Sequence, residues 1–207
     1  MELLLIRHAL PRRVELTEGP ADPGLAADGR AQTERLVGYL ASEPLDAVYA
    51  SPLRRAHETA APLARAQGLD VVPVAGVAEW DQDRPDYVPV EELKAADDPR
   101  WQALLDGTWT ATESAAEFRD RVRDTVEALV SAHRGDRVAV VCHGGVINAY
   151  LAHVLGLTTP NHAFFYPNYT SIHRVAAAST GERSIVTVNE TSHLRGTGLP
   201  MGLFQTG

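Results

Sequence analysis

Cysteine is nearly absent from this chain, since Cys142 is the only one among 207 residues. A single thiol excludes an internal disulfide and favours a reducing compartment, so we expect a cytoplasmic protein. Long apolar runs are missing too, and no stretch reaches the roughly 20 residues that a membrane-spanning helix needs. A secretory signal is not expected either, because the apolar run from Leu3 to Ile6 is followed at once by Arg7. The sequence therefore predicts a soluble protein with no membrane partner.

Basic residues are in the minority and nearly all of one kind. The chain has 19 Lys and Arg against 27 Asp and Glu, a formal net charge of −8, and Lys94 is its only lysine. This charge argues against nucleic acid as a partner. The arginines matter for phosphate, because each guanidinium fork can bind two oxygens at once. The length and the hydrophobic content of 44% suit a single domain over residues 1–207.

Short apolar strands alternate with amphipathic helices along the chain. Strands are predicted at residues 2–6, 45–49, 71–74, 137–142, 170–177 and 184–189, and helices at 26–41, 51–67, 90–95, 114–133 and 145–155. The helix from residue 51 is expected to have Ser51 as its N-cap and Pro52 at its first position. The alternation predicts an α/β protein, a three-layer α/β/α sandwich with a mainly parallel central sheet.

Three segments lack this pattern. Residues 11–23 are expected to form a loop, and residues 75–112 a small cap insertion over one edge of the sheet. The Gly-rich segment from Gly196 is expected to be mobile. In the cap, Trp80 and Tyr87 could line a substrate site or simply pack the insertion, and the sequence leaves both open.

Two of the predicted strands end in a histidine. Arg7-His8 closes the first strand, and His143-Gly144 follows the strand at 137–142. The carboxyl ends of parallel strands meet at one edge of a sheet, where ligands bind in α/β proteins. The helix after Ser51 should point its N–H groups at the same edge, which favours an anion. Neighbouring residues on a helix face different ways, so only one of Arg54 and Arg55 can readily enter this site.

The residues at this edge belong to an ordered set of motifs. The set comprises Leu5-Ile6-Arg7-His8-Ala9, Asp22-Pro23-Gly24-Leu25 with Gly29, Ser51-Pro52-Leu53-Arg54-Arg55-Ala56 with Thr59-Ala60, Val77-Ala78-Glu79, Val141-Cys142-His143-Gly144-Gly145, and Asn189-Glu190 with His193-Leu194. In this order the chain resembles the histidine phosphatase superfamily, in its phosphoglycerate-mutase-like branch.

The resemblance implies a metal-independent phosphatase of a small phosphorylated metabolite, with no cofactor. His8 would be the nucleophile that becomes phosphohistidine. The residues implied to bind the substrate are Arg7, Arg55, His143 and Gly144. Glu79 matches the proton donor to the leaving oxygen, but Asp81 is a rival, because the residues after Glu79 depart from the family pattern.

Other departures leave alternatives open. Residues 10–14 lack the Thr and Asn that follow the first histidine in mutases, which favours a phosphatase over a phosphoglycerate-type phosphomutase. A non-catalytic module that binds phosphorylated ligands is a third possibility. A zinc helix fails as an explanation of His57-Glu58, because position 61 is Ala. The apolar segment 155–166 could be core or the interface of a homodimer.

Overall fold

The computed structural model describes residues 1–106, 113–157, 164–203 and 207. Parts of the predicted cap (107–112) and of the apolar segment (158–163) therefore lie outside the described residues. The described strands form a six-stranded sheet in the order β4-β3-β6-β1-β7-β8, beside a two-stranded sheet of β2 and β5. The strands of the large sheet are β1 (Glu2–Arg7), β3 (Ala47–Ala50), β4 (Val71–Pro73), β6 (Arg137–Cys142), β7 (Ile172–Ala177) and β8 (Arg183–Glu190).

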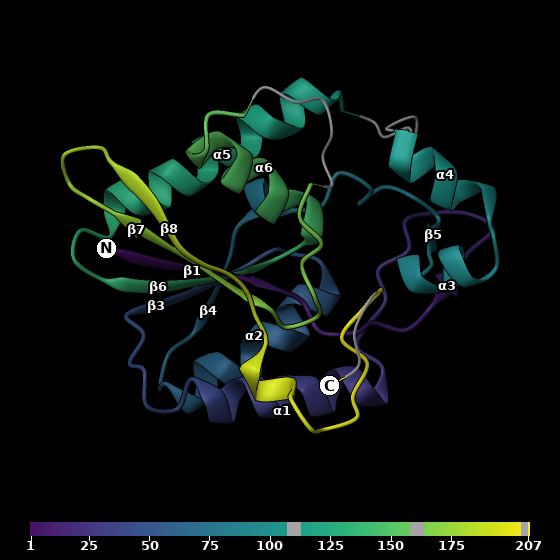
Figure 1. Ribbon diagram of the computed structural model, residues 1–207, viewed down its shortest axis with the longest axis horizontal. Coiled ribbons are helices and arrows are strands. Elements are labelled where there is room, and N and C mark those ends of the chain that lie inside the picture. Colours follow the sequence, from purple (N-terminus) through teal and green to yellow (C-terminus); the bar gives the residue numbers. More distant parts are fainter. Residues whose placement is uncertain (107–112, 158–163, 204–206) are drawn as a thin grey trace.

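The large sheet is mainly parallel, as predicted. β4, β3, β6 and β1 run parallel to one another, whereas β7 and β8 pair antiparallel at one side. Helices cover both faces of this sheet (Figure 1), with α1 and α2 on one side and α5 and α6 on the other. Their bounds are α1 (Ala27–Tyr39), α2 (Arg54–Ala66), α5 (Ala115–Ala132) and α6 (Gly144–Val154). The predicted three-layer α/β/α fold is confirmed.

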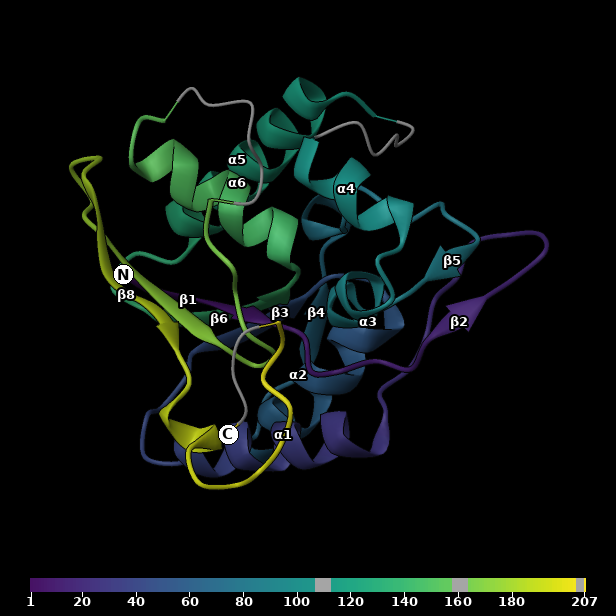
Figure 2. The same cartoon turned by 45° about the vertical axis from the view of Figure 1, so that its right-hand side comes forward.

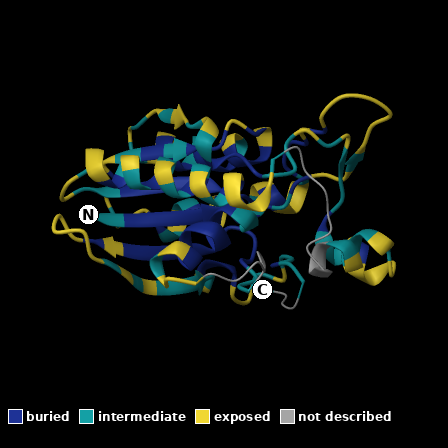
Figure 3. Ribbon diagram, turned by 90° about the horizontal axis from the view of Figure 1, so that it is seen from above, coloured by how far each residue is buried: buried dark blue, intermediate teal, exposed yellow. Residues whose placement is uncertain are grey.

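The alternation of side chains along β1 explains the two halves of the core. Leu3 and Leu5 pack into the cluster under α5 and α6, whereas Leu4 and Ile6 pack into the cluster under α1 and α2. A strand that is covered on both faces can be apolar at every position, which is why this segment is a continuous run. The buried sheet between helices with exposed outer faces is visible in Figure 3.

The smaller elements gather beyond the carboxyl edge of the sheet. They are β2 (Val14–Glu15), β5 (Asp86–Tyr87), α3 (Val90–Ala95) and α4 (Pro99–Asp106), with the 3₁₀ turns η1 (Ala75–Val77) and η2 (Ser192–Leu194) elsewhere in the chain. The prediction of a loop over residues 11–23 is wrong at β2, which pairs antiparallel with β5. Figure 2 shows this pair standing away from the large sheet, with α3 and α4 beside it. The pairing ties the segment after His8 to the cap.

The start of α2 differs from the prediction. The helix begins at Arg54 with Leu53 as its N-cap, so Ser51 does not cap it. The N–H group of Arg54 instead donates to the carboxylate of Asp22, 2.8 Å away. A side chain from another loop thus satisfies a helix-end donor, which leaves the hydroxyl of Ser51 available for a different partner.

The described part of the C-terminal tail is anchored, in contrast to the predicted mobility. Met201 is buried, and its carbonyl accepts a hydrogen bond from the N–H group of Tyr169. The N–H group of Leu203 donates to the hydroxyl of Tyr166, 3.0 Å away. The tail therefore supports two tyrosines that lie next to Arg7. Across the described helices, none combines the length and the apolar character needed to cross a membrane.

Candidate active site

His8 follows β1 and is held as a neutral, oriented imidazole. Its Nδ1 lies 2.8 Å from the carbonyl oxygen of Ala9, to which the ring N–H donates, so the lone pair stays on Nε2. Only 3% of His8 is exposed. Burial, together with the charges of Arg55 and Arg7, places the pKa of His8 well below its ordinary value. An imidazole in this state can act as a nucleophile at neutral pH.

His143 lies beside His8 as the N-cap of α6, with the two ring centroids 5.1 Å apart. Its Nε2 is 2.8 Å from the hydroxyl oxygen of Ser51. That hydroxyl also accepts the N–H group of Leu53. Nδ1 is buried and has no hydrogen-bond partner among the described residues. Ser51 is thus a site residue and not the helix cap that its sequence context predicts.

Arg7 and Arg55 complete the basic lining of the site. Both are buried, with 7% and 2% of the residue exposed. Arg7 donates to the carbonyl of Pro167 through Nη1, and its guanidinium lies over the Tyr169 ring at 4.3 Å. The Nε of each arginine is buried and has no partner among the described residues. Arg54, by contrast, is exposed and pairs with Glu58, so Arg55 is the arginine that enters the site.

Unpartnered buried donors indicate a missing acceptor. Leaving such a group without a hydrogen bond costs on the order of 1–3 kcal/mol, and more for charged groups. The Nε atoms of Arg7 and Arg55 are two such donors in one place, and Nδ1 of His143 is a third buried polar atom there without a partner among the described residues. A side-chain carbon added at Gly144, the first residue of α6, would meet only Arg7 Nε, at 4.0 Å. This open space, next to a helix N-terminus and lined by cations, suits a phosphoryl group.

Glu79 brings a carboxyl group to the same site. It accepts the N–H groups of Gly145 at 2.9 Å and Trp80 at 3.2 Å, and 8% of the residue is exposed. Burial and the charge of Asp81 raise the pKa of Glu79 to about 7. Such a carboxyl group can hold a proton near neutral pH and then release it.

Asp81 is placed differently from Glu79. Its Oδ1 lies 3.7 Å from Nη2 of Arg55, and 23% of its side chain is exposed. Burial raises the pKa of Asp81 as well, but the charge of Arg55 opposes this shift and favours the ionised form. Of the two acids, Glu79 is therefore the better proton donor, and Asp81 is better suited to hold Arg55 in place.

Tyr87 forms a wall of the site, one of the two roles that the sequence left open for it. Its ring lies 4.7 Å from the Arg55 guanidinium and meets the His8 ring edge-on, with centroids 6.4 Å apart. The ring reaches this position because β5 pairs with β2, just after His8 in the chain. A pairing of two residues against two leaves no periodic signal in the sequence.

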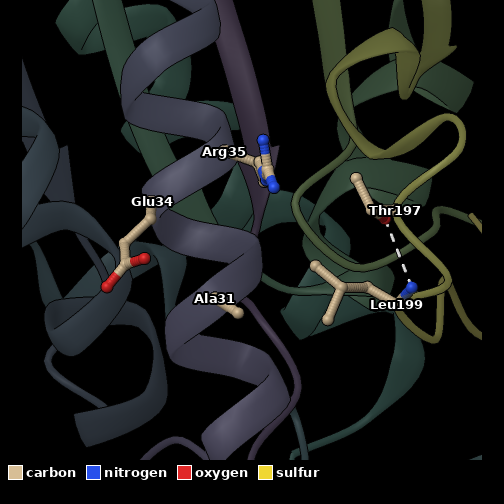
Figure 4. Close-up of a pocket in the computed structure, with 5 residues that line it drawn as sticks. All are labelled: Ala31, Glu34, Arg35, Thr197 and Leu199. Carbon is tan, nitrogen blue, oxygen red and sulfur yellow. Dashed lines mark hydrogen bonds between the residues drawn. The ribbon is translucent and has the colours of Figure 1, made fainter.

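Other parts of the molecule offer less. No group of three or more His, Cys, Asp or Glu side chains is arranged to hold a metal ion in the part of the chain that the structure describes. A cavity of about 330 Å³ lies between α1 and the C-terminal segment (Figure 4). It is lined by Ala31, Glu34, Arg35, Thr197 and Leu199, and so by none of the predicted site residues.

Comparison with known proteins identifies the family. The model of the histidine phosphatase superfamily (branch 1) matches residues 3–191. The chain is 29% identical over 203 residues to phosphoserine phosphatase 1 of Hydrogenobacter thermophilus, and the match covers 94% of each protein. It is 25% identical over 209 residues to a probable phosphoglycerate mutase of Erwinia tasmaniensis, covering 96% of this chain and 97% of the relative.

The fold is shared with solved structures. A mycobacterial glucosyl-3-phosphoglycerate phosphatase has a TM-score of 0.72 at 23% identity, covering 91% of this chain and 98% of that one. Three mycobacterial relatives with 30% identity over 201 residues are longer, and the chain covers 54% of their length. Because the family model spans nearly all of the sequence, the chain belongs to branch 1 of the histidine phosphatase superfamily.

Proposed function

We propose that this protein is a metal-independent phosphatase that hydrolyses a small phosphomonoester through a phosphohistidine on His8. One observation carries the proposal. A neutral His8, whose Nδ1–H donates to the carbonyl of Ala9, lies beside the buried Nε donors of Arg7 and Arg55, which lack an acceptor. Phosphoryl transfer needs positioning and charge neutralisation above all, which two arginines and a histidine can supply. The proposal includes a phosphorylated metabolite as the partner and the cytoplasm as the compartment.

The first step transfers the phosphoryl group to the enzyme. The lone pair on Nε2 of His8 attacks phosphorus, an N–P bond forms, and the bond from phosphorus to the leaving oxygen breaks. Glu79 gives its proton to that oxygen, so the product leaves as an alcohol. Arg7, Arg55 and His143 bind the remaining phosphoryl oxygens and neutralise their charge.

The second step reverses the proton transfer. The Glu79 carboxylate takes a proton from water, and the water oxygen attacks phosphorus. The N–P bond breaks, its electron pair returns to Nε2 of His8, and orthophosphate leaves. Both residues end in their starting protonation states, so the cycle balances as ester plus water to alcohol plus phosphate.

The comparisons support this proposal at the level of the reaction class. One full-length relative is named a phosphoserine phosphatase, and a structural neighbour is a glucosyl-3-phosphoglycerate phosphatase. The relative named a probable phosphoglycerate mutase favours a second candidate, a phosphomutase that returns the phosphoryl group to another hydroxyl. A mutase would depend on a bisphosphorylated primer, whereas a binding module would hold orthophosphate without turning over any ester.

The test of the proposed function is phosphate release from p-nitrophenyl phosphate in EDTA, between about pH 5 and pH 7.5, a range that brackets the ordinary histidine pKa. Turnover that survives the chelator supports metal-free chemistry. Turnover that stops in EDTA and returns with added Mg²⁺ or Zn²⁺ would contradict it.

Glu79→Gln should distinguish leaving groups. With an alkyl phosphate, whose alkoxide must be protonated, we expect kcat/KM to fall by about 10²- to 10³-fold. With p-nitrophenyl phosphate the loss should be much smaller. For the wild type on the alkyl ester, activity should decline as pH rises through about 7, because Glu79 then loses its proton. This decline should vanish in the variant. Equal losses on both esters would assign the proton transfer to another group, with Asp81 next in line.

Gly145→Ala should displace the Glu79 side chain while leaving the carboxyl group itself unchanged. A Cβ at this position would lie 2.3 Å from Oε1 of Glu79, so the carboxyl group must move. We expect kcat for an alkyl phosphate to fall by about 10²-fold, as for a displaced acid. Gly144→Ala is the matched comparison, since its Cβ points into the open space near Arg7 and should weaken inhibition by orthophosphate instead. The same phenotype in both variants would count against this division of roles.

A further inference from the structure

One buried acceptor near the site also lacks a partner. Oε2 of Glu91 is buried and has no hydrogen-bond partner among the described residues, and no described basic residue forms an ion pair with Glu91. The residue lies in the first turn of α3, two residues after Pro89, the N-cap of that helix. A carboxylate oxygen removed from water without a donor is unfavourable, which makes Glu91 a candidate for binding a ligand.

Neighbouring contacts place the chain segment around Glu91 beside the site. Four residues before it, Tyr87 lies over Arg55 and against His8. The next residue, Glu92, bonds Nη1 of Arg13 in the segment that follows His8. The negative charge of Glu91 acts on both Arg7 and Tyr87, so it contributes to the electrostatic potential at the phosphoryl site. Figure 2 shows α3 next to β5 in this part of the molecule.

The charge balance indicates what kind of group Glu91 would bind. The unpartnered Nε donors of Arg7 and Arg55 match a phosphoryl group, which offers only acceptors. Once a phosphate dianion has neutralised the two arginines, Glu91 is left without a cation. A carboxylate can accept but not donate, so its complement must be a donor, and a cationic donor forms the stronger bond.

We infer that Glu91 binds a protonated amine on the leaving group, so that the preferred substrate is a phosphate ester of a small amino alcohol or hydroxy amino acid. This inference rests on the proposed phosphatase activity and adds the substrate class. It makes Glu91 a residue that determines specificity, separate from the residues that bind the phosphoryl group.

Two esters that differ in one group provide the test. Phosphoethanolamine carries an ammonium where 2-hydroxyethyl phosphate carries a hydroxyl, with the same chain length. We expect wild-type kcat/KM to be about 10- to 100-fold higher for the amine, as a charge-assisted hydrogen bond would give. Glu91→Gln keeps the size of the side chain but removes its charge, so this ratio should fall to about threefold or less.

The matched control is Glu92→Gln. This neighbour is 46% exposed and pairs with Arg13, so removing its charge should leave the amine-to-hydroxyl ratio unchanged. Inhibition by orthophosphate is a second readout. In Glu91→Gln it should stay as strong or become stronger, because a negative charge near Arg7 is lost.

The possible failures are distinguishable. Turnover of p-nitrophenyl phosphate without a preference for the amine would overturn the role of Glu91 and leave the proposed function intact. Equal losses on all three esters together with weaker orthophosphate inhibition would show that Glu91 supports the site structurally, which also overturns the inference. No turnover of any ester would overturn the proposed function, and this inference with it.

Discussion

Replacing His8 with alanine is expected to lower phosphate release by about 10⁴- to 10⁶-fold, the largest effect of any single substitution. The variant lacks the Nε2 lone pair that attacks phosphorus, and no other histidine in the site can replace it. His143 is the nearest candidate, but its Nε2 is engaged by Ser51. The measurement is single-turnover release of alcohol and phosphate from the same ester, in wild type and variant.

The fold of the His8→Ala variant should persist. The backbone at this position is held independently of the ring, by the bond from the His8 N–H group to Cys142 and from the Ala9 N–H group to Thr59. Circular dichroism and thermal unfolding would check this. Activity within about tenfold of wild type would exclude His8 as the nucleophile, given the losses that removal of a nucleophile normally causes.

Arg55→Ala is expected to reduce kcat/KM by about 10³-fold, the second largest effect. Arg55 contributes positive charge to the phosphoryl site and packs against the ring of Tyr87. Together with burial, which has the larger effect, its charge lowers the pKa of His8. Its loss should therefore weaken inhibition by orthophosphate as well as slow the reaction. Steady-state kinetics and orthophosphate inhibition constants, measured side by side, would show both effects.

Arg55→Lys is the control for this prediction. Lysine keeps the charge but loses the planar fork, so we expect partial recovery of orthophosphate binding and little recovery of rate. Because Arg55 is 2% exposed, the stability of both variants must be compared with that of wild type. Full activity in a folded Arg55→Ala variant would remove this residue from the phosphoryl site.

The sheet was predictable because its strands are buried on both faces. Such strands have an uninterrupted apolar sequence, so β1 and β6 stand out without any periodicity. β1 and β6 are parallel neighbours, with Arg7 opposite Cys142 in the register, and this brings His8 next to His143. The sequence pattern predicted that both histidines lie at the same edge of the sheet, and the strand order makes them neighbours there.

The rest of the site depends on contacts between distant segments, which local patterns do not encode. Ser51 has the sequence context of a helix N-cap. In the structure the carboxylate of Asp22 accepts the first N–H group of α2, and the hydroxyl of Ser51 contacts His143. Tyr87 reaches Arg55 only through a pairing of two residues with β2. The two acids of the cap could be told apart only once Gly145 and Arg55 were seen beside them.

The most direct measurement is detection of the phosphoenzyme. Wild type would be mixed with an excess of p-nitrophenyl phosphate, quenched in alkali, digested and analysed by mass spectrometry for phosphate on histidine. The account predicts phosphate on His8, absent from His8→Ala, and enriched in Glu79→Gln, where no carboxylate activates the water. Rapid turnover with no phosphorylated histidine at any time, or with phosphate on His143, would contradict it.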